Sequence, residues 1–124
     1  MKKASILFGV LLVVVSVAKA AGLDMDLMQT VEDTNKSLSS NIALQDASAS
    51  TKDAQELHEL FKVVEGHYQS KPEAPDGLEL SRKSLQLTEQ IIKQVGAKDF
   101  TGASDSSTAL SRTCRACHTF YKQS

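Results

Sequence analysis

The chain has no tryptophan, two prolines and two cysteines, and just five aromatic side chains follow its first 20 residues. No stretch alternates between apolar and polar residues with a period of two, so nothing predicts a half-buried β-strand. Paired carboxylates, a nucleophile beside a base and a glycine-rich phosphate loop are also missing, which argues against an enzyme. With so few large side chains, a core of this size packs on Leu, Ile, Val and Ala, or on a bound group.

The first 20 residues have the pattern of an export signal. A basic start, Met1-Lys2-Lys3, precedes the apolar run "ASILFGVLLVVVSV", and Ala18-Lys19-Ala20 has the small-x-small form of a cleavage site. We expect cleavage after Ala20 and delivery to a bacterial periplasm, with an uncleaved anchor as the alternative. No second apolar run follows, so we expect one domain over residues 21–124 without stable membrane association.

The charge of the expected mature chain is acidic. Without Lys2, Lys3 and Lys19, the 14 basic residues fall to 11 against 15 acidic ones, a net charge near −4. This balance argues against nucleic acid as a partner and allows a basic protein partner.

Four segments have the apolar periodicity of helices: 24–44, 52–69, 77–95 and one from 100 towards the end of the chain. We expect Ser50 or Thr51 to cap the second helix, Asp76 and Glu79 to form a capping box on the third, and Gly96 to end it. Asp99 is the expected N-cap of the fourth. Four helices with short connections predict an all-α, antiparallel, up-down-up-down four-helix bundle.

The last of these segments contains a C-x-x-C-H motif formed by Cys114, Cys117 and His118. A disulfide is the usual state of two cysteines in an exported protein, but this pair would close a very small loop. A zinc site would need two more ligands, and His58 and His67 lie nine residues apart on one helix, roughly on opposite sides. The motif favours covalent attachment of a c-type haem, because both thiols project to one side and the histidine reaches the iron.

The position of the motif indicates which class of cytochrome the chain resembles. The stretch "CRACHTFYK" closes the sequence, and no methionine follows it. This arrangement resembles the class II c-type cytochromes, the cytochrome c-prime family, which are four-helix bundles with this motif near the end of the last helix. The resemblance implies one haem c bound through Cys114 and Cys117, with His118 as an axial ligand, and it leaves a homodimer open.

A second resemblance concerns both ends of the expected mature chain. The stretches "AGLDMDLMQTVEDTNKSL" and "ALSRTCRACHTFYK" are similar to the ends of the periplasmic b-type four-helix cytochrome. This resemblance implies Met28 as the second axial ligand, opposite His118, and Lys122 as a partner of the haem propionates. The plainer interpretation of Lys122 is a solvated lysine, and that of Met28 is a methionine of the core.

The sixth iron position separates two functions. With Met28 as ligand, the resemblance implies a low-spin carrier of single electrons between redox proteins. An open position implies a five-coordinate cytochrome c-prime that binds small gases such as NO or CO. Met25, one turn earlier, is the alternative ligand, and we expect His58 and His67 to be polar surface residues. Arg112 and Arg115 are interpreted as facing solvent. The aromatic residues are interpreted as packing residues, some of them against the haem: Phe61, Tyr68, Phe100, Phe120 and Tyr121.

Overall fold

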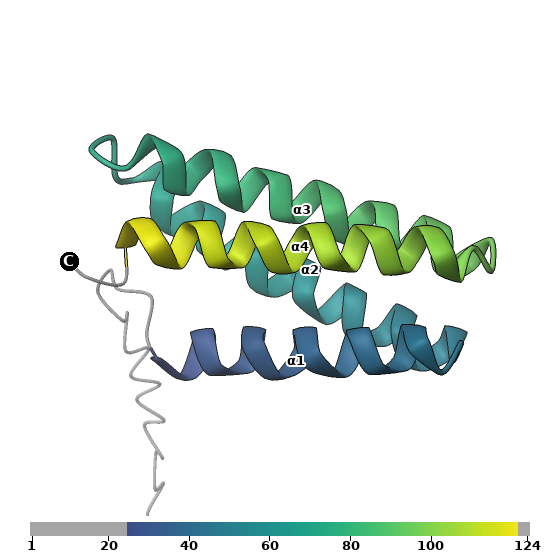
Figure 1. Cartoon of the computed structure of the whole chain (residues 1–124). Helices are drawn as coiled ribbons and strands as arrows, with labels where there is room; N and C mark the ends of the chain where they lie inside the picture. Colours follow the sequence, from purple (N-terminus) through teal and green to yellow (C-terminus); the bar gives the residue numbers. More distant parts are fainter. Residues whose placement is uncertain (1–24, 122–124) are drawn as a thin grey trace, which may run out of the picture.

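The computed structural model describes residues 25–121, with side chains placed as far as His118. Over this range the chain forms four α-helices: α1 (Met25–Ala43), α2 (Ala47–Gln69), α3 (Pro75–Gly96) and α4 (Phe100–Tyr121) (Figure 1). The expected export signal and Lys122 lie outside the described residues, and so do the side chains of Phe120 and Tyr121.

The helices pack as an antiparallel bundle in which neighbours in sequence are neighbours in space. α2 packs on α1 and α3, α3 packs on α4, and α4 closes the bundle against α1. The N-terminal end of α1 and the C-terminal end of α4 lie at the same end of the bundle (Figure 1). The predicted all-α, up-down-up-down four-helix fold is therefore confirmed, and the α1–α4 contact is the least extensive of the four.

The helix ends follow local capping chemistry, which confirms one prediction and corrects three. Asp99 caps α4 as expected, because its Oδ1 accepts the backbone N–H of Gly102 at 2.9 Å. α2 begins earlier than predicted, since Asp46 Oδ1 accepts the N–H of Ala49 at 3.0 Å and draws residues 47–51 into the helix. Asp46, not Ser50 or Thr51, is therefore its N-cap.

The ends of α3 also differ from the prediction. Pro75 occupies its first turn, where the missing N–H costs nothing, so Asp76 lies inside the helix and the capping box does not form. At the other end Gly96 is still helical and Ala97 is the C-cap. The left-handed residue of this turn is Lys98, with a φ of 57°.

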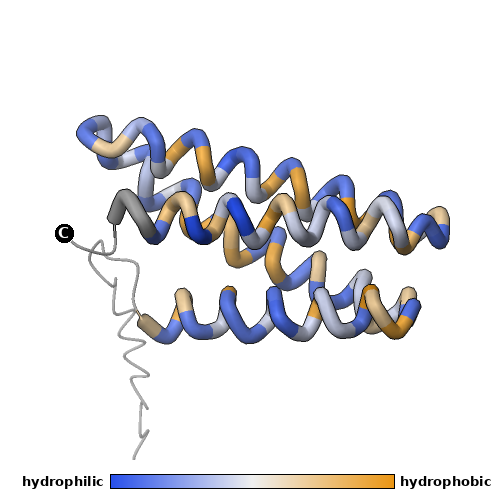
Figure 2. The backbone as a smooth tube through the Cα atoms, in the orientation of Figure 1, coloured by the Kyte–Doolittle hydropathy of each residue, from blue (hydrophilic) through white to orange (hydrophobic). Residues whose placement is uncertain are grey.

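The core lies along the inward faces of the helices, and hydrophobic positions recur between hydrophilic ones along each of them (Figure 2). On α2 the periodicity of the sequence predicted an apolar stripe with spacings of three and four, and all of its members are buried, which confirms it: Ala54, Leu57, Phe61, Val64 and Tyr68. On α1 the buried residues are Val31, Thr34, Leu38 and Ile42, while Met28 and Asn35 are half-buried. α4 contributes Ala103 and Leu110.

The inward face of α3 differs from the apolar stripe that its periodicity predicted, which consists of Leu78, Leu85, Ile91, Ile92 and Val95. Ile91 and Val95 are buried as expected, but Leu78, Leu85 and Ile92 are only partly buried. The other buried positions are small or hydroxylated: Gly77, Ser81, Ser84 and Thr88. Each hydroxyl donates to a carbonyl of its own helix, which satisfies it without a partner from another helix. The half of the bundle around Ser81 and Ser84 is therefore thinly filled.

Polar side chains link the helices at several points. Ser37 and Asn41 of α1 both donate to Asp53 of α2, at 2.7 and 2.8 Å. The α1–α4 contact contains two further bonds, Asn35 to Ser111 and Ser39 to Ser107, each 3.1 Å. None of the described helices has the length and apolar character that a membrane crossing requires.

Candidate functional site

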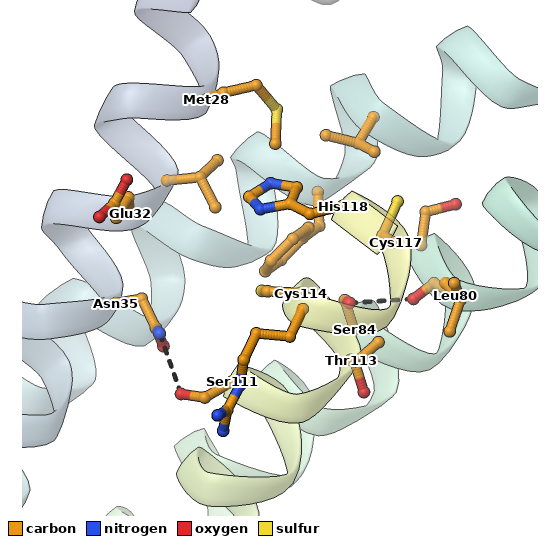
Figure 3. A pocket seen from close by; sticks show the side chains of 15 residues that line it. Met28, Glu32, Asn35, Leu80, Ser84, Ser111, Thr113, Cys114, Cys117 and His118 are labelled. Carbon is orange, nitrogen blue, oxygen red and sulfur yellow. Dashed lines mark hydrogen bonds between the residues drawn. The ribbon is translucent and has the colours of Figure 1, made fainter. Parts of the chain in front are cut away.

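A cavity of about 330 Å³ lies in the half of the bundle that contains the beginning of α1 and the end of α4. Its walls come from all four helices and include four residues that the sequence singles out (Figure 3): Met28, Cys114, Cys117 and His118. Ninety residues of sequence separate Met28 from His118, yet the antiparallel arrangement of α1 and α4 brings them to one cavity. The volume lies near the lower end of the range for small-molecule sites, about 300–1,000 Å³.

Met28 and His118 approach the cavity from opposite walls. Met28 lies one turn into α1 and is half-buried, and His118 lies in the last turn of α4 and is exposed. In Figure 3 the two side chains point towards one another across the cavity. Met25 does not line the cavity and is 87% exposed, so Met28 is the better placed of the two methionines.

The two cysteines lie one turn apart on α4, and both are free thiols in the structure. Burial raises the pKa of Cys114 to about 11, and the neighbouring Cys117 adds to this shift. Burial also raises the pKa of Cys117, while a side-chain hydrogen bond with Tyr68 opposes the rise. Both thiols are therefore protonated near neutral pH, and neither is a strong nucleophile by itself.

The other two histidines take no part in this cavity. The Nε2 of His58 lies 3.2 Å from Glu89 Oε1, in a contact between α2 and α3. His67 stacks edge-on against Tyr68 with ring centroids 4.9 Å apart, and burial followed by the charge of Lys71 lowers its pKa. Their placement agrees with the expectation that both are polar residues of α2.

The cysteines and His118 do not form a metal cluster of the zinc type. Among residues 25–118, no three side chains of His, Cys, Asp or Glu are placed to hold one ion. The imidazole of His118 and the two thiols face the same cavity without converging on a single point within it. This arrangement disfavours a zinc site, which needs three or four such ligands at one centre.

The inner wall of the cavity is polar, a feature that the helix patterns alone did not predict. Asn35 Nδ2 donates to Ser111 Oγ, and Asn35 Oδ1 is buried without a hydrogen-bond partner. Ser81 and Ser84 form the α3 wall, each 3% exposed. Two features of the sequence could have indicated this polar wall. Asn35 interrupts the apolar stripe of α1, and serines occupy inward positions of α3.

Charged residues stand at the mouth of the cavity. Glu32 of α1 and Arg115 of α4 are exposed and line it from these two neighbouring helices. Arg115 faces solvent as expected, but it also borders the cavity. Glu32 forms an ion pair with Lys36 at 3.0 Å along its own helix. Because exposed residues form this rim, the cavity opens to solvent on their side, and a group bound inside would be partly exposed.

The residues around the cavity include the side-chain types that would hold a covalently attached haem. Two reduced thiols one turn apart, an imidazole from the same helix and a thioether from the facing helix all border one space. Small side chains on α3 leave that space unfilled where leucines would otherwise pack. The orphaned oxygen of Asn35 further indicates a region whose polar groups are not fully satisfied by the chain itself.

Comparisons with protein-family models, with curated proteins and with solved structures found no match to this chain. The resemblance to class II cytochromes therefore depends on the stretch "CRACHTFYK" and its position, and the resemblance to the b-type four-helix cytochrome depends on the two terminal stretches quoted above.

Proposed function

We propose that the chain is a monohaem c-type cytochrome of the cytochrome c-prime class that carries single electrons. The observation that carries the proposal is the shared cavity, which brings Met28 of α1 to the same space as Cys114, Cys117 and His118 of α4. A chance C-x-x-C-H at a helix end has no reason to face an unfilled cavity in the bundle core. It also has no reason to face a methionine from another helix.

Each residue would have a separate role. Cys114 and Cys117 would hold the group through two thioether bonds, and His118 would bind the iron from the α4 side. Met28 would bind the iron from the α1 side, since its side chain points towards His118 (Figure 3). Bound there, haem would supply a centre that gains or loses one electron, and with both Met28 and His118 holding the iron the required rearrangement would be small.

The rest of the chain would limit the access of water and hold Met28 and His118 apart. Phe61 and Val64 of α2 line the cavity and are buried, so they provide an apolar wall behind the group. Glu32 and Arg115 remain at the solvent side. Lys122 stays a proposed propionate partner from outside the described residues.

The proposal extends to location and partners. Export to a bacterial periplasm follows from the signal pattern of residues 1–20, and the partners would be other redox proteins of unknown identity. The net negative charge favours partners with a basic surface. The proposal includes no enzymatic role.

A mass measurement on the purified protein tests the cofactor. The chain should start at Ala21 and carry the added mass of one haem, which persists after denaturation because the thioether bonds are covalent. A mass two hydrogen atoms below that of the bare chain would indicate a disulfide between Cys114 and Cys117 and would contradict the proposal.

Absorption spectra test the ligation. We expect low-spin spectra in both oxidation states and a methionine-to-iron charge-transfer band at the red end of the oxidised spectrum. A high-spin ferrous spectrum that changes on adding CO or NO would instead support the five-coordinate gas-binding alternative. The feature favouring that alternative is the half-buried position of Met28, near the open end of the cavity.

A further inference from the structure

The helix α1 is joined to the rest of the bundle by the two least extensive interfaces. α2 packs more extensively on α3 than on α1, and α4 also packs more extensively on α3 than on α1. The other three helices are thus joined to one another without α1. Because regions with few packing contacts open at a lower free energy than the rest of a fold, α1 is the helix expected to separate first.

The interface between α1 and α4 contains neutral polar contacts. Asn35 donates to Ser111, and Ser39 and Ser107 share a hydrogen bond, each between side chains 3.1 Å apart. Ser39 is exposed, and Asn35 and Ser111 are half-buried, so water can replace these bonds when the helices separate. The net cost of such an exchange is small, because water satisfies the same donors and acceptors.

The attachment of α1 to α2 is concentrated near the turn that joins them. Ser37 and Asn41, in the second half of α1, both donate to Asp53 at 2.7 and 2.8 Å. Closer to the cavity, the contact between Thr34 and Glu56 is longer, at 3.5 Å. The first half of α1 is therefore held less firmly than the second half.

This first half is also one whole wall of the cavity. All the α1 residues that line the cavity lie in it: Met28, Val31, Glu32 and Asn35. Met28 and His118 point towards one another across the space, so a large flat ring has to come between them (Figure 3). Movement of this wall away from α4 would uncover the cavity along its α1 side.

We propose that the first half of α1, residues 25–36, is a gate that swings away from α4 about the α1–α2 turn, admits haem and closes over it. The inference rests on the proposed function, because haem is the occupant for which the gate would open. α2, α3 and α4 would stay packed during the movement, and closure would return Met28 to its place opposite His118.

Two adjacent serines of α4 provide a matched test. Ser107→Ala removes a hydrogen bond between α4 and α1, and Ser106→Ala removes one between α4 and Gln94 of α3. Both serines are buried and lie outside the cavity lining. The rate of haem uptake follows the population of the open form, so ferrous haem should enter haem-free Ser107→Ala about fivefold faster than wild type. Ser106→Ala should keep the wild-type rate, and equal rates in the two variants would overturn the inference.

A reversible cross-link should hold the gate shut. Ser39→Cys with Ser107→Cys places two sulfurs where hydroxyl oxygens now lie 3.1 Å apart, which is close enough for a disulfide. Cys114→Ser and Cys117→Ser in the same chain prevent thiol exchange and leave both proposed iron ligands in place. We expect non-covalent haem uptake to be at least tenfold slower in the oxidised chain and to recover on reduction. Uptake that does not change on oxidation would contradict the gate.

Hydrogen exchange of the haem-free chain separates the gate from the proposed function. A detached helix of this length is unstable in water, so the amides of residues 31–36 should exchange through one common opening that urea promotes. Its free energy should lie below that of global unfolding, and the cross-link should abolish it. Fraying of the helix end would show no dependence on urea.

The outcomes of these measurements are distinct. If the wild-type chain takes up no haem, the proposed function fails, and haem entry fails with it, while a common opening of residues 31–36 still supports the gate itself. If haem binds but these amides exchange only by fraying or by global unfolding, the inference fails alone.

Discussion

Asn35 Nδ2 donates a hydrogen bond to Ser111 Oγ at 3.1 Å, and this contact closes the cavity at its inner end. Beyond it, towards the α1–α2 turn, Ser39 and Ser107 join the same two helices. On the other side lies the cavity that Met28 and His118 border. The Asn35–Ser111 pair therefore marks the depth to which a group can enter between α1 and α4.

The Asn35–Ser111 pair should show a strong energetic coupling. Ser111→Ala removes the acceptor and leaves the whole Asn35 amide unpaired, so we expect a loss of about 1 kcal/mol in the free energy of unfolding. The double variant Asn35→Leu with Ser111→Ala removes both the bond and the orphaned Oδ1, and should be at least as stable as wild type. Urea unfolding of the haem-free chain measures both. Simple additivity of the two single substitutions would contradict this coupling.

Met28→Ala should convert a six-coordinate haem into a five-coordinate one. Removing the thioether opens the iron on the α1 side, so the reduced protein should become high-spin and bind CO readily. Met25→Ala is the matched control and should leave the spectrum unchanged, because Met25 is exposed and outside the cavity. The ligand assignment is wrong if Met25→Ala changes the spectrum and Met28→Ala does not.

Ser84→Leu should fill the cavity from the α3 side. Leucine at this buried position places its side chain where the group would lie, so we expect haem content to fall by about tenfold or more. The haem-free chain should gain about 1 kcal/mol in stability from the added apolar burial. Ser104→Leu, on the exposed side of α4, adds the same side chain away from the cavity. Equal haem content in both variants would show that the group binds elsewhere.

The free thiol of Cys114 should make the haem-free chain less stable in alkali. Burial raises the pKa of Cys114 from its ordinary 9.0 to about 11, so the folded chain keeps this proton longer than the unfolded chain does. Below pH 9 the protonated Cys114 thiol makes its full contribution to the free energy of unfolding. This contribution falls by about 2 kcal/mol as the pH rises towards 11. Lysines and tyrosines also titrate there, so the measured quantity is the difference between wild type and Cys114→Ser. The haem-attached protein has no such thiol, and its stability should lack this component.

Local patterns in the sequence predicted the number and approximate extent of the helices. Apolar residues at spacings of three and four on α2 identified its buried face correctly, since that periodicity follows from helix geometry alone. The Asp99 cap was predicted for the same reason, because an N-cap depends on residues three positions apart. The beginning of α2 was missed, since Asp46 competes as a cap with Ser50 and Thr51 and several residues suit that role.

The sequence also predicted that Cys114, Cys117 and His118 lie together, because C-x-x-C-H places two thiols and an imidazole within one and a half turns of a helix. The surroundings of these three residues could not be predicted from such local patterns. That Met28 rather than Met25 lines the cavity with His118, and that serines of α3 leave that cavity unfilled, both depend on which helix faces meet. These residues lie on different helices and far apart in the sequence, and their arrangement follows from how four helices pack together, which no local spacing specifies.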